Sequence, residues 1–100
     1  MGDPRFHALL KEIAILHDGK QEDYGVAADP FANVRASEEF GIPAWLGTLV
    51  RLNDKVHRLK AYAKTGKLKN EGVEDSLMDI SVYALISLVL FREQQGSRDG

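Results

Sequence analysis

Four acidic residues near the end of the chain have a spacing that suits a divalent cation. Glu71, Glu74, Asp75 and Asp79 all lie within segment 70–94, which has the pattern of one long helix. At about 100° per residue, Glu71, Asp75 and Asp79 form a slowly drifting stripe with Glu74 beside it. Magnesium accepts a few carboxylates, keeps several waters and binds substrate phosphates. One interpretation of the stripe is therefore a magnesium site that serves phosphate chemistry.

A simpler interpretation applies to three of these acids. Glu71, Glu74 and Asp75 lie in the expected first turn, where carboxylates interact favourably with the positive end of the helix dipole. Asp79 lies one turn deeper, where the sequence becomes apolar and an isolated carboxylate is costly to bury. Asp79 therefore requires a partner, which is either a base on a neighbouring helix or a cation shared with Glu71 or Asp75.

The preceding helical segment, 43–65, supplies the bases. Five of its residues fall within an arc of about 100°, and they are Arg51, Asp54, Lys55, Arg58 and Tyr62. In one interpretation this face is solvated and Asp54 pairs with its basic neighbours. In the other, Asp54 reaches a metal while the bases hold phosphates. If the two helices are antiparallel, Arg51, Lys55 or Arg58 is also the candidate partner of Asp79.

A third group of candidates lies between residues 19 and 36, where helical periodicity fails and the composition favours an ordered loop. Long loops in small domains are often functional. This one contains Lys20, Tyr24, Phe31 and Asn33. The alternative is that its aromatic rings only fix the loop to the core.

Three main helices are expected to position these residues. Asp3 and Pro4 form a helix start, and Gly19 is expected to end a first helix over 4–18. A short helical turn is expected at 37–40. The helix over 43–65 is expected to bury an apolar stripe made of Trp45, Leu46, Leu49, Leu52, Val56 and Leu59. With no strand pattern, the fold class is all-α, as one domain over 1–95 with a disordered tail over 96–100.

The uncharged run 80–91 predicts how this domain is completed. Its twelve residues are too few to cross a bilayer, which needs about 20. The run is therefore expected to form a helical core or a subunit interface, which predicts a homo-oligomer.

Composition excludes several other classes. A net charge of −2 with interspersed signs argues against a general nucleic-acid binder. The chain has no Cys, so disulfides and thiolate chemistry are excluded. The first residues lack the pattern of a signal peptide, and a cytoplasmic protein is expected.

Taken in order, these motifs resemble those of the MazG-like all-α nucleotide pyrophosphatase superfamily. The likeness is greatest to its nucleotide-modification-associated branch, which occurs in bacteriophages and bacteria. It covers nearly the whole chain and rests on Lys20…Tyr24-Gly25…Phe31-Ala32-Asn33, Trp45…Arg51…Asp54-Lys55…Arg58-Leu59 and Glu71…Glu74-Asp75…Asp79-Ile80…Tyr83.

The resemblance implies a helical homodimer or homotetramer that hydrolyses a nucleoside triphosphate to its monophosphate and pyrophosphate with Mg²⁺. It implies Glu71, Asp75 and Asp79 as metal ligands, with Glu74 or Asp54 completing the acidic cluster as the catalytic carboxylate. Substrate-binding residues by the same resemblance are Lys20, Tyr24, Asn33, Arg51, Lys55 and Arg58. Tyr24, Phe31 or Trp45 would flank the base.

The chain also departs from the superfamily pattern. Members place a Glu-x-x-Glu pair on one helix and a Glu-x-x-Asp pair on the next, whereas here the first of these helices offers Asp54 alone. Ser76 stands where the second pair would have its Glu. The metal set is therefore either completed by Glu38 or Glu39, or lost in an inactive nucleotide binder. The remaining alternative is a non-catalytic helical oligomerisation or protein-interaction module.

Overall fold

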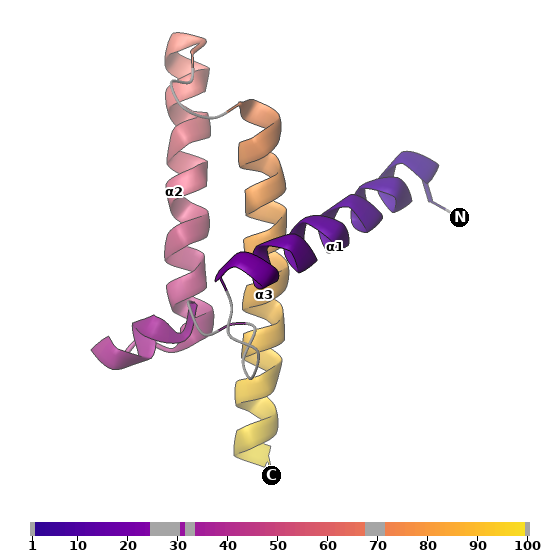
Figure 1. Ribbon diagram of the computed structural model, residues 1–100. Coiled ribbons are helices and arrows are strands. Elements are labelled where there is room, and N and C mark those ends of the chain that lie inside the picture. The colour runs from indigo at the N-terminus through magenta and orange to yellow at the C-terminus, as the bar shows by residue number, and fades with distance from the viewer. Residues whose placement is uncertain (1, 25–30, 32–33, 68–71, 100) are drawn as a thin grey trace. The chain divides into compact units, whose positions relative to one another are not determined.

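The computed structural model describes residues 2–24, 31, 34–67 and 72–99 (Figure 1). Its elements are α1 (Pro4–Tyr24), the short 3-10 helix η1 (Val34–Phe40), α2 (Ala44–Thr65) and α3 (Val73–Asp99). Every regular element in the described residues is helical, which confirms the all-α prediction. The chain divides into two compact units, 1–33 and 34–100. The single domain over 1–95 stays a prediction.

The first unit contains α1, which begins as predicted. The backbone N–H of Arg5 donates to the Asp3 carboxylate at 2.7 Å, and the Arg5 guanidinium donates to the same group. These bonds from Arg5, the guanidinium first, hold the pKa of Asp3 below its usual value. The predicted end at residue 18 is wrong, because the helix passes through Gly19 to Tyr24. One glycine costs a helix only about 1 kcal/mol, and the residues after it sustain the helix.

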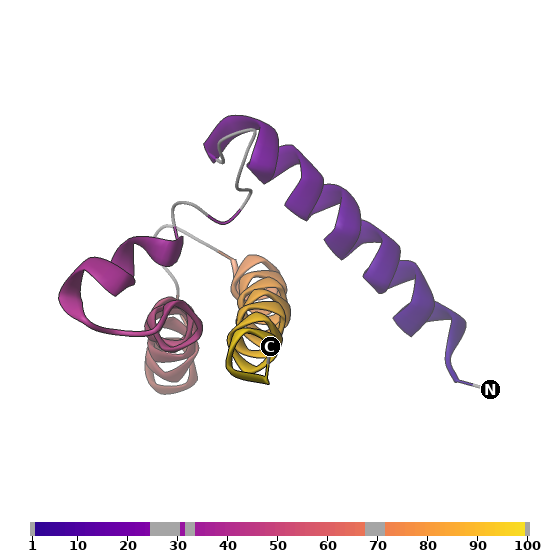
Figure 2. The ribbon, with the colours of Figure 1, turned by 90° about the horizontal axis from the view of Figure 1, so that it is seen from below.

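The second unit is built on an antiparallel pair of helices. Figures 1 and 2 show α2 and α3 side by side, with η1 next to the start of α2. Gly66 ends α2 in the left-handed conformation, at φ 72°, and its N–H donates to the Tyr62 carbonyl at 2.7 Å. This confirms the predicted end of the second helix. The third helix starts later than predicted, at Val73, and continues beyond Gln95 to Asp99.

The most buried residues of α2 differ from the predicted stripe. The buried residues of α2 are Ala44 and Thr48, whereas Leu46 is 38% exposed. The buried residues of α3 include Val82, Ile86 and Leu90. The other apolar residues of the predicted stripe are only half-buried.

Two contacts fix the axial register of α2 against α3. The Ser87 hydroxyl donates to the Trp45 carbonyl at 2.9 Å. The rings of Trp45 and Phe91 meet edge to face with centroids 5.2 Å apart. The first turn of α2 is thus held against the C-terminal half of α3, so that the middle of α2 lies opposite the start of α3.

The start of α2 is also held by η1, which is longer than the predicted turn at 37–40. The Ser37 hydroxyl donates to the Ile42 carbonyl at 3.1 Å. Gly41, at φ 76°, makes the turn between the two helices. A Cβ added at Gly47 would meet the Ser37 side chain, so this glycine allows η1 to lie close against α2.

No helix in the described residues has the length and apolar character needed to cross a membrane.

Candidate functional site

The centre of the α2–α3 contact contains a lysine and an aspartate. Lys55 Nζ lies 3.1 Å from an Asp79 carboxylate oxygen, and only 19% and 16% of the two side chains are exposed. Both charges are largely withdrawn from water, so each depends on the other far more than in a surface pair. Of the partners that the sequence left open for Asp79, the structure therefore shows a base from the antiparallel neighbour.

The other acids of the stripe lie differently. Glu74 and Asp75 are exposed at the start of α3. An Asp75 carboxylate oxygen lies 3.7 Å from the Cβ position of Gly72, immediately before the helix. This placement agrees with the simpler interpretation, in which acids in the first turn stabilise the helix dipole. Glu71 lies outside the described residues.

A metal set is not complete in the part of the chain that the structure describes. It contains no group of three or more His, Cys, Asp or Glu side chains placed to hold a metal ion. Asp75 and Asp79 lie one turn apart on α3 and provide the hard oxygen donors that Mg²⁺ prefers. These carboxylates are chemically suited to Mg²⁺, but two of them are too few for a site. Glu71 or another carboxylate would have to complete it.

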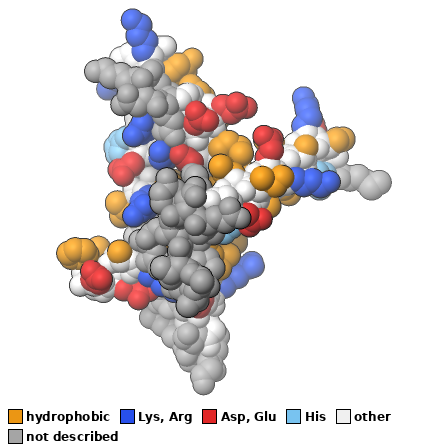
Figure 3. Space-filling model, viewed as in Figure 1, with side chains coloured by type: hydrophobic (Ala, Val, Ile, Leu, Met, Phe, Trp, Pro, Cys, Tyr) orange, Lys and Arg blue, Asp and Glu red, His pale blue; other side chains and the backbone are white. Residues whose placement is uncertain are grey.

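The bases predicted on α2 form a row along one side of the helix. Arg51, Asp54 and Arg58 are exposed, and Lys55 lies among them at the α3 contact. Arg51 is one turn before Lys55 and Arg58 one turn after it. Of this basic row, the structure brings Lys55 into contact with Asp79 of α3. Figure 3 shows acidic and basic side chains intermixed on the visible face, without a large surface of one sign.

The candidates from the expected loop belong to the first unit. Lys20 and Tyr24 lie in the last turns of α1 instead of a loop. Their side chains, and all of Asn33, lie outside the described residues. Phe31 stacks on His17 of α1, with ring centroids 5.9 Å apart. This contact agrees with the alternative that loop aromatics fix the chain to a helix.

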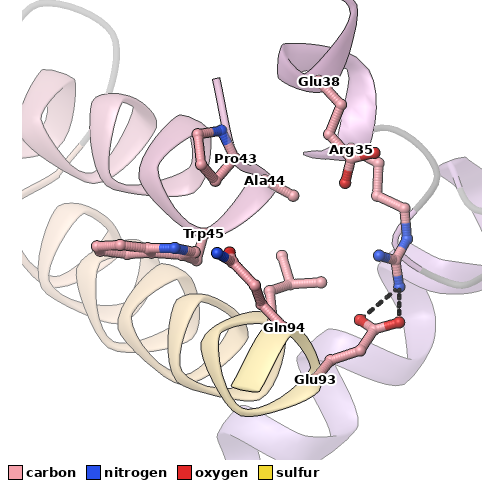
Figure 4. A pocket seen from close by; sticks show the side chains of 8 residues that line it. Arg35, Glu38, Pro43, Ala44, Trp45, Glu93 and Gln94 are labelled. Carbon is pink, nitrogen blue, oxygen red and sulfur yellow. Dashed lines mark hydrogen bonds and ion pairs between the residues drawn. The ribbon is translucent and has the colours of Figure 1, made fainter. Parts of the chain in front are cut away.

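A cavity of about 350 Å³ lies where η1, the start of α2 and the end of α3 meet. Figure 4 shows Arg35 and Glu93 on one side of it and Trp45 on the other. The Arg35 guanidinium donates to the Glu93 carboxylate at 2.9 Å. The cavity is lined by Arg35, Glu38, Pro43, Ala44, Trp45, Leu90, Glu93 and Gln94.

The charges of this cavity do not suit a phosphate group. Among the described lining residues, Arg35 is the one base. Its positive charge is paired with Glu93, and Glu38 adds a second negative charge to the lining. Sequence reasoning did not identify the Arg35–Glu93 pair, because the two residues are 58 positions apart and neither belongs to a motif. A periodicity argument contains no signal for such a contact.

No family model, curated protein or solved structure matches the chain.

Proposed function

We propose that this protein is a magnesium-dependent pyrophosphohydrolase that converts a nucleoside or deoxynucleoside triphosphate to its monophosphate and pyrophosphate. The proposal rests on the Lys55–Asp79 contact of 3.1 Å. That contact joins a row of bases on α2 to carboxylates on α3. A triphosphate needs bases for its oxygens, and its accompanying cation needs carboxylates, so one region of the hairpin offers both.

In this proposal the α2 residues bind the phosphates. Arg51, Lys55 and Arg58 are placed along about two turns of the helix, which suits an extended chain of phosphates. Lys55 exchanges its contact with Asp79 for a contact with substrate. The Asp79 carboxylate is then available, with Asp75 and Glu71, to hold Mg²⁺.

Bound Mg²⁺ would neutralise phosphate charge and lower the pKa of a coordinated water. Glu74 or Asp54 has the remaining role, as the carboxylate that orients the attacking water and accepts its proton. Both are exposed, Asp54 immediately before Lys55 on α2 and Glu74 five residues before Asp79 on α3. The attack is in line with the departing pyrophosphate and requires no covalent nucleophile.

The test is pyrophosphate release from a panel of ribo- and deoxyribonucleoside triphosphates, with and without Mg²⁺. We expect at least one nucleotide to be hydrolysed only when Mg²⁺ is present. Asp79→Asn should abolish that activity, and Glu12→Gln, on an exposed position of α1, should leave it unchanged. Failure of the wild-type protein to hydrolyse any nucleotide would overturn the proposal.

A second candidate function is a non-catalytic interaction module. It is favoured by apolar side chains that α3 leaves exposed, including Leu77, Leu85 and Leu88 at 52%, 47% and 44%. In such a module the acids serve solubility and helix capping. Asp79→Asn would then weaken the helix pair without any effect on a reaction.

A further inference from the structure

We infer that the cavity between η1, the start of α2 and the end of α3 binds a small organic cation, an ammonium group carried on an aliphatic chain. The inference is independent of the proposed hydrolase and of the interaction module. Leu90 lines the cavity and lies 11 residues after Asp79, which is about 16 Å along the axis of α3. The cavity is therefore a separate site from the one proposed for nucleotide hydrolysis.

The cavity has the size and the apolar lining that a small ligand requires. Its volume of about 350 Å³ lies within the range of about 300–1,000 Å³ of ligand pockets. Pro43 and Ala44 line it at the start of α2, and Leu90 lines it on α3. Ala44 and Leu90 are only 6% and 3% exposed, so they belong to the packed helix contact. These side chains offer an apolar surface to an aliphatic chain.

The walls of the cavity are held by contacts between distant parts of the second unit. On one side, Arg35 of η1 donates to Glu93 of α3 at 2.9 Å. On the other side, the Trp45 ring packs edge to face on Phe91, and the Trp45 carbonyl accepts from Ser87. A ligand therefore meets a preformed cavity and needs to order little of the chain when it binds.

The charge of the lining favours a cation. The positive charge of Arg35 is matched by Glu93. Glu38 adds a negative charge, and its carboxylate makes no ion pair with another residue that the structure describes. Figure 4 shows the Glu38 side chain extending from η1 toward the cavity. One positive charge on a ligand would therefore balance the charge of the described lining.

An ammonium group suits this lining better than a metal ion does. The Glu93 carboxylate already accepts from Arg35, and the described side chains include no group of three or more metal ligands. An ammonium group donates up to three hydrogen bonds, and the Glu38 carboxylate and the Gln94 amide oxygen are acceptors in the lining. Its aliphatic chain would at the same time cover Leu90, which a metal ion would leave uncovered.

Trp45 is the one tryptophan of the chain and lines the cavity, so its fluorescence reports binding. The probes n-hexylamine, 1-hexanol and hexanoate share an aliphatic chain and differ in charge, and methylamine carries the charge without the chain. We expect hexylamine to bind with a Kd of about 1 mM or below. It should bind at least about tenfold more tightly than the other three. Equally tight binding of any of the three, or no binding of hexylamine, would overturn the inference.

Two neighbouring acids of η1 give a matched pair of variants. Glu38→Gln removes a charge that lines the cavity, whereas Glu39→Gln removes an exposed charge that is not among the described lining residues. Glu38→Gln should weaken hexylamine binding about tenfold and leave hexanol binding unchanged. Glu39→Gln should change hexylamine binding less than about twofold. Equal losses in the two variants would overturn the inference, because they would show attraction to net charge alone.

An ammonium group on an aliphatic chain occurs both in free amines and in lysine side chains. Nα-acetyl-lysine methylamide, which carries a peptide group on each side of the lysine, distinguishes these two sources. Binding weaker than that of hexylamine would support the inference with a free amine as the ligand. Binding as tight or tighter would support it with a lysine side chain of a peptide as the ligand.

Discussion

The Lys55–Asp79 pair makes the sharpest prediction about stability. The perturbation is a double-mutant cycle of Lys55→Met, Asp79→Leu and both together. Exposed ion pairs contribute about 0.2–1 kcal/mol, and removal of one partner from a fully buried pair costs about 3–5 kcal/mol. With side chains 19% and 16% exposed, each single variant should lose about 1–3 kcal/mol. That loss corresponds to a fall in Tm of roughly 5–20 °C for a domain of this size.

The double variant should behave differently from the sum of the single ones. It replaces both charges with apolar side chains of similar reach, which removes the cost of keeping ions at the helix contact. We expect its free energy of unfolding to lie within about 1 kcal/mol of wild type, which implies a coupling energy of about 1–3 kcal/mol.

Urea unfolding followed by tryptophan fluorescence is a suitable assay. Trp45 is the one tryptophan of the chain and packs on Phe91 at the same helix contact. All variants should be compared at one protein concentration, because association shifts apparent stability. Glu93→Gln is the matched control, since its 51% exposed side chain should make its loss smaller than about 1 kcal/mol. Single variants no more costly than this control, or additive losses in the double variant, would refute the reasoning.

Three further predictions concern other parts of the chain. Ser76 is fully buried and its hydroxyl has no hydrogen-bond partner in the described structure, so Ser76→Ala should leave the free energy of unfolding in urea unchanged or raise it. Ser87→Ala, by contrast, removes a hydrogen bond to the α2 backbone and should lower the free energy of unfolding by about 0.5–1.5 kcal/mol. Gly47→Ala should destabilise by about 1–3 kcal/mol, despite better helix propensity, because its methyl group meets Ser37; a more stable variant in the same assay would contradict this. The Asp3 cap has a lowered pKa, so its contribution to α1 is complete above the ordinary pKa and is lost as pH falls through the lowered one; amide hydrogen exchange of the first turn should then accelerate, and Asp3→Asn should remove this pH dependence.

Local signals in the sequence identified the helices well. The start of α1 at Asp3-Pro4 and the end of α2 at Gly66 follow from residues that cap helices through their own backbone or side chain. Gly19 was misleading because a glycine ends a helix only where the chain needs a left-handed residue, and here α1 continues. The all-α class could be predicted from the helical periodicity of the sequence alone.

Contacts between helices were harder to predict. Periodicity grouped the apolar residues of α2 into one stripe, but it did not show that Ala44 and Thr48 would be the buried residues of this helix. That choice depends on how closely two backbones approach. The sequence left three bases or a cation as candidate partners of Asp79. Lys55 is selected only by the axial register between α2 and α3, which Trp45 and Ser87 fix.

The central claim is that carboxylates at the start of α3 hold a divalent cation, and metal binding itself tests it most directly. Substoichiometric Mn²⁺, as a paramagnetic substitute for Mg²⁺, broadens NMR signals of nearby amides. We predict the strongest broadening at residues 72–80, reversed by excess Mg²⁺ and absent in Asp79→Asn. No selective broadening there, or broadening centred on Glu38 and Glu93 instead, would contradict the claim.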